Sequence, residues 1–272
     1  MRNIDNEIKF EAVGPVGQIT IDRPPHNYTD LLLLKKLADT LQHSEELKLR
    51  SLLLLSTGKN FCAGADFSTG GVGSPDETSI PNEKIAPAKK FEKDTNAFYY
   101  QALRILNTAI PIVCLIQGAA VGAGLGLALA TDYRIGTKNA KFTAPFVKLG
   151  IHPGFGLTYL LPKIVGHTKA TDMLLTGRRV YADEALQIGL LNDLTEESQL
   201  LDRGMKMAQL MAENAPLAIQ ATKRTLNSQT VKKVQKILVH ELSQQVELIN
   251  TKDALIGIEA SLNRTKPEFI GE

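Results

Sequence analysis

Tryptophan is absent from this 272-residue sequence, and only two cysteines are present, Cys62 and Cys114. Both lie in apolar surroundings, so a disulfide framework and a metal site built on paired cysteines are excluded. We therefore expect no bound metal and a reducing, cytoplasmic environment. The N-terminal segment also lacks the apolar stretch of a secretory signal and the acid-poor, Arg-rich character of a transit peptide.

An excess of charge of either sign is missing as well. The 31 basic and 29 acidic side chains give a formal net charge of +2, and no run of five or more like charges occurs. A balanced chain has no general attraction to phosphate backbones or anionic membranes. We expect no nucleic-acid partner and no membrane association.

One uncharged stretch, Ala109 to Ala130, is long enough to span a bilayer. It contains Pro111, Gln117 and four glycines. These residues favour a buried strand followed by a glycine-rich turn and a buried helix over a membrane span.

Apolar patterning predicts an α/β body in the first part of the chain. A β-hairpin is expected from apolar and polar alternation on both sides of a Gly-Pro turn, and a continuous apolar run predicts a buried strand. Strands alternate with helices along the chain, which is typical of α/β layering. The predicted strands are 8–13, 18–22, 51–56, 111–116 and 132–136. The predicted helices are 31–41, 91–106 and a segment ending at 130, and the first of them is expected to have its N-cap among residues 28–30.

The later part of the chain is predicted to be mostly helical. Residues 68–90 have five Gly or Pro residues between positions 70 and 81 and show little periodicity, which predicts a long surface loop before this part. Apolar positions at helical spacing then recur to the C-terminus. The predicted helices are 167–176, 183–189, 201–214, 216–227 and 231–250.

The segment from Gly118 to Gly126 contains four glycines between a predicted strand and a predicted helix. A dinucleotide fingerprint is disfavoured, because the spacing is GxGxG and no acidic residue ends a second strand about twenty residues later. A P-loop is excluded, since the chain has no Gly-Lys-Ser/Thr. The glycines either permit close packing of strand and helix or leave backbone N–H groups free for a ligand oxygen.

A second segment of small residues favours the ligand interpretation. Lys59 to Phe67 (KNFCAGADF) also follows a predicted buried strand. Two such turns in one domain could each direct one N–H group at the same carbonyl oxygen, and such a pair forms an oxyanion hole.

These motifs resemble those of the enoyl-CoA hydratase/isomerase (crotonase) superfamily, and the matching stretches cover nearly the whole chain in the order of the family. The stretches are IDRPPHN at 21–27, FCAGADF at 61–67, IQGAAVGAGLGLALATDYRIG at 116–136, FTAPFVKLGIHPGFGLTYLLPKIVG at 142–166, ADEALQIGLLND at 182–193 and DALIGIEASLNRTKPEF at 253–269.

The resemblance implies an α/β spiral of ββα units over residues 1–200 and a helical region over 201–272 that forms a homotrimer or a dimer of trimers. It implies an acyl-CoA thioester as substrate or ligand, with no further cofactor. The oxyanion-hole donors fall on the backbone N–H groups of Ala65 and Ala123. The adenine end of CoA falls on the backbone around Ala63, Ala65, Asp66 and Phe67.

The sequence departs from the family where carboxylates are expected. The two hydratase glutamates map to Gly126 and Phe146, and the carboxylate of isomerase-type relatives maps to Gly154. Together with Gly122, these residues are expected to line the substrate pocket. We expect the apolar replacements Gly126 and Phe146 to enlarge this pocket and to make it less favourable for water.

Few side chains are left as candidates for proton transfer. His152 is the first, because an imidazole has a suitable pKa and lies close to the position of the isomerase base. Weaker candidates are Tyr99, Tyr100, Thr143 and Tyr159, while Cys62 and Cys114 are expected to be small core residues.

Three hypotheses about function remain open. The chain is an enzyme that stabilises an enolate, an acyl-CoA-binding protein without efficient turnover, or a scaffold that uses only its oligomer. Resemblance in fold cannot separate them, because function depends on the site.

Overall fold

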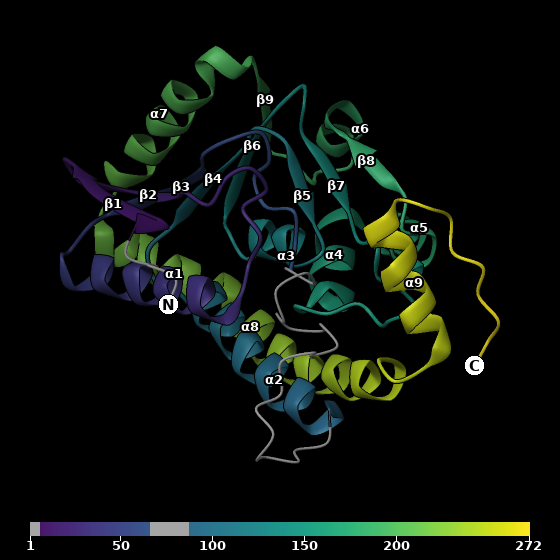
Figure 1. Ribbon diagram of the computed structural model, residues 1–272. Coiled ribbons are helices and arrows are strands. Elements are labelled where there is room, and N and C mark those ends of the chain that lie inside the picture. Colours follow the sequence, from purple (N-terminus) through teal and green to yellow (C-terminus); the bar gives the residue numbers. More distant parts are fainter. Residues whose placement is uncertain (1–5, 66–86) are drawn as a thin grey trace.

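The computed structural model describes residues 6–65 and 87–272 and contains two sheets surrounded by helices (Figure 1). The larger sheet has the strand order β1-β2-β3-β4-β6-β9, and the smaller has the order β5-β7-β8. The strands of the larger sheet are β1 (Ile8–Val13), β2 (Val16–Ile21), β3 (Ser51–Ser56), β4 (Ile112–Ile116), β6 (Tyr133–Thr137) and β9 (Asp193–Thr195), and those of the smaller sheet are β5 (Ala119–Val121), β7 (Lys141–Thr143) and β8 (Arg179–Tyr181).

Helices cover both faces of the larger sheet. They are α1 (Leu31–Glu46), α2 (Pro87–Leu106), α3 (Ala123–Leu129), α4 (Leu157–Val165), α5 (His167–Thr176), α6 (Ala182–Gln187), α7 (Leu200–Ala212), α8 (Pro216–Leu248) and α9 (Lys252–Asn263), with short 3₁₀ helices η2 (Phe146–Leu149) and η3 (Glu197–Gln199). The predicted α/β architecture with a helical C-terminal part is confirmed.

The first two strands form the predicted hairpin. β1 and β2 pair antiparallel, and Val13 lies opposite Val16, so only Gly14 and Pro15 form the turn. Gly14 has a φ of 60°, a left-handed conformation that glycine adopts without steric cost. From β2 onward the neighbouring strands of the larger sheet are parallel, which requires the crossover helices that the sequence pattern predicts.

The start of α1 follows from its N-cap. The Asp30 side chain accepts a hydrogen bond of 2.8 Å from the backbone N–H of Leu33, which satisfies one of the free donors of the first turn. Leu34, Leu37 and Leu41 on the same face are fully or almost fully buried. This apolar face packs toward the sheet, as its helical spacing predicts.

The C-terminal helices pack against the body of the chain. α7 covers one face of the larger sheet, where Gly204 lies against Leu53 and Leu115 and the Ser51 hydroxyl donates to the Ala208 carbonyl at 2.7 Å. α8 packs against α2 and α4, and α9 against η2 (Figure 1). A domain boundary after residue 200 and an oligomeric role of 201–272 stay predictions.

Predicted helix boundaries were wrong at three places, and the first is the end of α1, which continues to Glu46 instead of ending at 41. α2 begins at Pro87, four residues before the predicted start; Lys89 and Lys90 in its first turn are exposed, so this turn carries no apolar signal. Residues 216–250 were predicted as two helices but form the single helix α8. Thr230, between the two predicted helices, is buried and accepts a hydrogen bond from Lys163 on α4, so tertiary packing continues the helix.

The uncharged stretch from 109 to 130 folds as β4, β5 and α3, which lie in the core. Among the described residues, no helix has the length and apolar character needed to cross a bilayer. Strands β5, β7, β8 and β9 and helices α4 and α9 were not predicted. Most of these elements are short, with three residues in each of the four strands.

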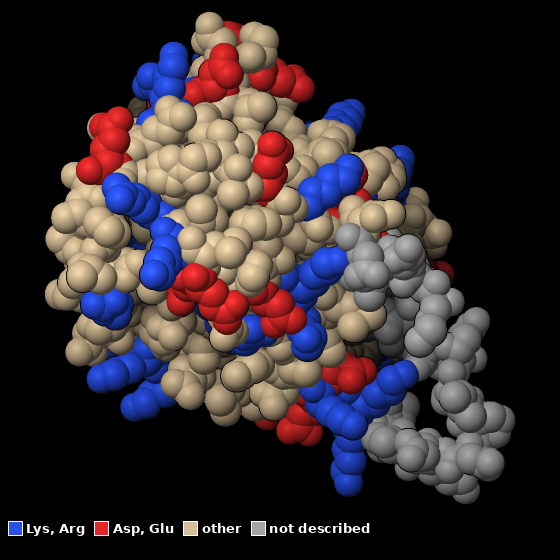
Figure 2. Space-filling view, turned by 90° about the vertical axis from the view of Figure 1, so that its left-hand side faces the viewer, with Lys and Arg blue, Asp and Glu red and all other residues tan. Residues whose placement is uncertain are grey.

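Asp132 links the larger sheet to α8. Its carboxylate accepts a hydrogen bond from the backbone N–H of Ile112. It also forms an ion pair with Lys223, whose Nζ lies 2.6 Å from Asp132 Oδ2. Lys223 is buried, and its ammonium also donates to the Ile110 carbonyl. Asp132 therefore stabilises the start of β4. On the face of the molecule in Figure 2, basic and acidic side chains are interspersed.

Candidate functional site

Two turns rich in small residues lie side by side at the carboxyl ends of β3 and β4. The backbone N–H of Cys62 donates to the Ala119 carbonyl, and the N–H of Val121 donates to the Cys62 carbonyl, both at 3.0 Å. A Cβ on Gly124 would lie only 2.8 Å from the Cys62 sulfur. Part of the glycine-rich pattern is therefore explained by close packing.

The conformations of two other glycines set the backbone direction at this site. Gly64 has a φ of 101°, and a Cβ there would lie 3.0 Å from the Val121 carbonyl oxygen. Gly122, the N-cap of α3, has a φ of 53°, and its N–H donates to the Thr143 carbonyl at 2.9 Å. Each glycine immediately precedes a proposed oxyanion-hole donor, Ala65 or Ala123.

Ala65 and Ala123 both line one cavity. Within the part of the chain that the structure describes, neither backbone N–H has a hydrogen-bond acceptor. Ala123 is the first residue of α3, where the N–H has no partner inside the helix. Two free N–H donors at one cavity can hold a single carbonyl oxygen.

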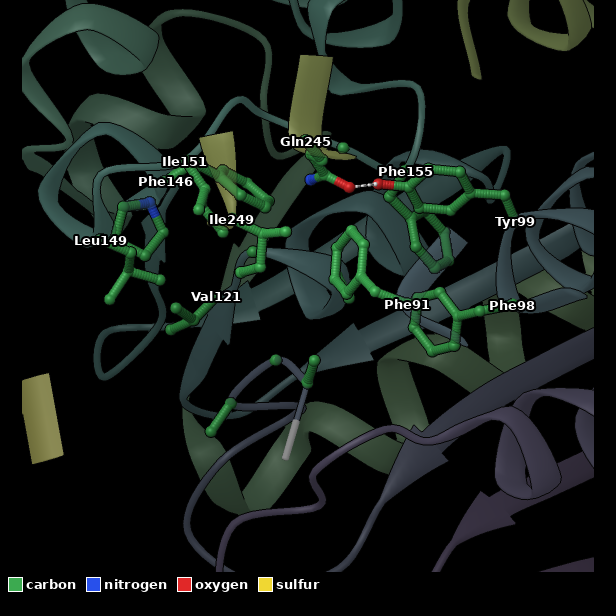
Figure 3. A pocket seen from close by; sticks show the side chains of 17 residues that line it. Phe91, Phe98, Tyr99, Val121, Phe146, Leu149, Ile151, Phe155, Gln245 and Ile249 are labelled. Atoms are coloured by element: carbon green, nitrogen blue, oxygen red, sulfur yellow. Dashed lines mark hydrogen bonds between the residues drawn. The ribbon is translucent and has the colours of Figure 1, made fainter. Parts of the chain in front are cut away.

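The cavity between these turns, α2 and α8 is lined mainly by apolar side chains (Figure 3). Its described lining residues include no Asp, Glu, His, Lys or Arg. They are Ala63, Gly64, Ala65, Phe91, Phe98, Tyr99, Val121, Gly122, Ala123, Pro145, Phe146, Leu149, Ile151, Gly154, Phe155, Gln245 and Ile249.

Among the residues predicted to line the pocket, Gly122, Phe146 and Gly154 line this cavity and Gly126 does not. A Cβ on Gly126 would overlap the ring of Phe155, whose Cγ would lie 2.7 Å away. The expectation that glycine at 126 enlarges the pocket was therefore wrong, because the Phe155 ring fills the space. Phe155 has a φ of 64°, an uncommon conformation for a residue with a large side chain.

The space beside Gly154 is also occupied. A Cβ on Gly154 would overlap the hydroxyl oxygen of Tyr99 and lie 2.7 Å from the side-chain nitrogen of Gln245. The Tyr99 hydroxyl donates to Gln245 Oε1 at 2.7 Å, and Gln245 Nε2 donates to the His152 carbonyl at 2.8 Å. Figure 3 shows this phenol and amide meeting at the cavity wall.

Tyr99 is held in its neutral form. Burial raises the pKa of its phenol well above the usual value, and the nearby Glu241 carboxylate adds to the increase. The phenol is therefore available as a hydrogen-bonding group and not as a phenolate base.

The His152 imidazole is absent from the described lining of the cavity, which this residue approaches through its backbone carbonyl. Its Nδ1 lies 2.6 Å from the Pro153 carbonyl, and its ring contacts His240 edge-on. Burial lowers the pKa of His152, so the neutral imidazole is favoured. The role of His152 in proton transfer stays a prediction.

Of the weaker candidates, Tyr99 lines the cavity, whereas Tyr100, Thr143 and Tyr159 lie outside its described lining. Tyr100 is 61% exposed, and Tyr159 packs under the Lys233 ammonium. The Thr143 side chain is buried. Burial raises the pKa of both Cys62 and Cys114 to about 12, so neither thiol forms a reactive thiolate at neutral pH.

Asn27 supports the turn that carries Ala65. It is fully buried with a φ of 51°. Its side-chain nitrogen donates to the Thr57 and Asn60 carbonyls at 2.7 and 2.8 Å, and its side-chain oxygen accepts from the Arg23 N–H at 2.9 Å. The carbonyl of His26 accepts from the Ala63 N–H. The IDRPPHN motif thus holds the segment before the site.

Glu241 is a fully buried carboxyl group next to the cavity wall. Its oxygens accept hydrogen bonds from the Gly156 N–H at 2.7 Å, the Thr158 N–H at 3.0 Å and the Thr158 hydroxyl at 2.6 Å. Burial raises its pKa to about 7. The carboxyl group thereby fixes the turn that carries Phe155.

Sequence reasoning did not identify Gln245, Glu241 or Asn27. A signal existed for the first two, because both occur at helical spacing with the buried Val234 and Leu238 of α8. Polar residues on a buried helix face need partners, and here their partners belong to the cavity wall. The predicted CoA contacts at Asp66 and Phe67 lie outside the described residues.

Comparisons with known proteins identify the family to which this chain is similar. The family model described as enoyl-CoA hydratase/isomerase matches residues 11–272. The chain is 31% identical to a "Probable enoyl-CoA hydratase" of Bacillus subtilis, over 98% of this chain and 100% of the relative. It is 30% identical to the "Short-chain-enoyl-CoA hydratase" of Clostridium acetobutylicum, over 97% of each.

The fold is shared with a solved structure of an enoyl-CoA hydratase/isomerase from Pseudoalteromonas atlantica. The TM-score is 0.84 and the sequence identity 27%, with 97% of this chain and 100% of the other covered. The described α/β architecture thus matches a crotonase fold.

Proposed function

Since this chain belongs to the enoyl-CoA hydratase/isomerase family, which implies a place in acyl-CoA metabolism, we propose that it binds an acyl-CoA thioester and stabilises the enolate of its acyl group. The observation that carries this proposal is the pair of free backbone N–H groups, Ala65 and Ala123, at one cavity. In this proposal both donate to the thioester oxygen, where negative charge develops when the thioester becomes an enolate.

The cavity lining supports an uncharged acyl group as the bound part. Phe91, Phe98 and Phe146 contribute aromatic surface, and Leu149 and Ile249 contribute aliphatic surface. Burying apolar surface of the ligand here is favourable. The CoA portion is proposed to lie along Ala63, Asp66 and Phe67, and the protein is proposed to work as a homotrimer or a dimer of trimers.

A second candidate function is acyl-CoA binding without efficient turnover. It is favoured by the absence of a carboxylate among the described cavity-lining residues. Hydration of an enoyl thioester needs one group to activate water and another to deliver a proton to Cα. Apart from Tyr99, no titratable side chain is found among the described lining residues.

One experiment separates the two candidates. The purified protein is incubated with enoyl-, dienoyl-, hydroxyacyl- and malonyl-type CoA thioesters, while binding is followed by calorimetry and products by mass spectrometry. Turnover of one class supports the enzyme, and binding without product supports the second candidate. Absence of binding for every thioester would overturn both. In the enzyme case, His152→Ala tests the imidazole, since unchanged turnover would remove it from the mechanism.

A further inference from the structure

Among the described residues that line the cavity, two have polar side chains, and they come from two helices far apart in the sequence. Tyr99 of α2 and Gln245 of α8 meet through the hydrogen bond of 2.7 Å from the phenol to the amide oxygen (Figure 3). Tyr99 is 5% exposed and Gln245 is 5% exposed. A second hydrogen bond, from Gln245 Nε2 to the His152 carbonyl, fixes the orientation of the amide.

Glycine at position 154 is what makes room for this pair. Any side chain there would overlap the Tyr99 hydroxyl and press against the Gln245 nitrogen. The position at which a carboxylate is expected from the family is therefore occupied by a neutral phenol and amide. The chain has a polar group here, but the group carries no charge.

The hydrogen bonds of the pair leave defined donors and acceptors. The Tyr99 hydroxyl donates its proton to Gln245 Oε1, and Gln245 Nε2 donates one of its two protons to the His152 carbonyl. Within the described part of the chain, no acceptor takes the second Nε2 proton. The phenol oxygen also faces the Phe155 backbone N–H. One Nε2 donor therefore remains, together with one lone pair on the phenol oxygen and one on the amide oxygen.

A hydroxyl group complements this set best, because it can accept from Nε2 and donate to a lone pair at the same time. A saturated acyl chain would leave the buried amide proton without a partner, which is unfavourable. An acyl carboxylate would meet no cation among the described lining residues and would be desolvated without a counter-charge.

We propose that Tyr99 and Gln245 form a neutral polar subsite that selects an acyl-CoA thioester bearing a hydroxyl group on its acyl chain. This inference rests on the proposed function, since it names the ligand class of the same cavity. Tyr99 and Gln245 act as specificity-determining residues, and Gly154 acts by leaving them space.

The test compares matched ligands by isothermal titration calorimetry. Butyryl-CoA, 3-hydroxybutyryl-CoA and 4-hydroxybutyryl-CoA are titrated into the full-length protein, and the ratio of dissociation constants is taken for each hydroxylated ligand against butyryl-CoA. We expect at least one hydroxylated thioester to bind about fivefold more tightly, as one or two net hydrogen bonds provide. Tyr99→Phe and Gln245→Leu should each bring that ratio close to one.

Two controls accompany these variants. Tyr100→Phe removes a hydroxyl from an exposed tyrosine of the same helix, and Gln244→Leu changes the residue next to Gln245; both should keep the wild-type ratio. Tyr99→Phe removes a single oxygen atom, and its melting temperature checks that it folds. Equal binding of all three thioesters, or an unchanged ratio in both Tyr99→Phe and Gln245→Leu, would overturn the subsite and leave the proposed function intact. If no thioester binds, the proposed function fails with it.

Discussion

Gly126 and Phe155 are complementary in shape: the aromatic ring occupies the space that a side chain at position 126 would need. The Phe155 backbone is left-handed, with a φ of 64°, and the Gly156 N–H beside it is bound by the Glu241 carboxyl group. At the position where the resemblance implies a hydratase glutamate, the space for a side chain is thus filled by the Phe155 ring. Simple replacement of the residue cannot restore the site of a hydratase.

We expect Gly126→Glu to be destabilising and inactive as a hydratase. The new side chain meets the Phe155 ring in a closely packed interior, and overpacking of this kind costs about 1 to 3 kcal/mol, with the burial of a charge adding to it. Denaturant unfolding measures the loss of stability, and loss of the enoyl absorbance measures hydration. Wild-type stability of this variant would contradict the packing described here.

The matched variant combines Gly126→Glu with Phe155→Gly and Phe146→Glu. Glycine at 155 removes the ring and accepts the positive φ, so stability should be higher than that of a protein with the other two changes alone. The carboxylates can then face the cavity, and we expect measurable hydration of a short enoyl-CoA. If the combined variant is as unstable as the variant without Phe155→Gly, the ring is not the obstacle.

Removal of one proposed oxyanion-hole donor should reduce turnover strongly. Ala123→Pro deletes the N–H at the first position of α3, where proline is tolerated in a helix. Loss of one such donor lowers the turnover rate by about 100- to 1,000-fold. The measurement is single-turnover kinetics on the best thioester from the panel, with Ala123→Gly, which keeps the N–H group at this position, as the matched control. Turnover at the wild-type rate would exclude the Ala123 N–H as an oxyanion-hole donor.

Glu241 should make stability depend on pH between about 4.5 and 7. Its pKa is raised from 4.5 to about 7 in the folded protein, so the folded state binds the proton more tightly than the unfolded state. Stability is therefore greatest below pH 4.5 for this group and falls as the pH rises to 7, by on the order of 3 kcal/mol in total. Above pH 7 its contribution is constant.

Glu241→Gln should remove this dependence, because an amide does not ionise in the range. Urea unfolding at several pH values measures it, and Glu247→Gln, at an exposed position of the same helix, should keep the wild-type profile. An identical profile in Glu241→Gln and the wild type would show that the carboxyl group titrates with its ordinary pKa.

Asn27 should be important for both stability and ligand binding. Asn27→Ala removes three hydrogen bonds made by a buried side chain. It also places alanine at a φ of 51°, a left-handed conformation that asparagine adopts more readily, and we expect a loss of about 2 to 4 kcal/mol. Asn27→Gly loses the same bonds without the backbone strain, so it should be the less destabilised of the two. Thermal unfolding and thioester affinity are measured together, because the turn with Ala65 should lose its order. An Asn27→Ala protein as stable as the wild type would contradict this role.

Local pattern alone determined the hairpin, the buried strand Ser51–Ser56, the start of α1 with a cap among residues 28–30, and the α/β class. These features depend on alternation, helical spacing and turn residues within a few positions of one another. Together with the family motifs, the sequence also placed the two small-residue turns and the positions without carboxylates. Ala65 and Ala123 could be named because backbone donors depend on the turn and not on the side chain.

Only the tertiary structure decided what fills the space of the missing carboxylates. Phe155 lies 29 residues after Gly126, and Gln245 lies 91 residues after Gly154, so no local pattern relates the members of either pair. The sequence shows two glycines and suggests an empty pocket; packing instead puts an aromatic ring beside one and a phenol and amide beside the other. The physical reason is that close-packed interiors leave little space unfilled, and which side chain fills it depends on the fold.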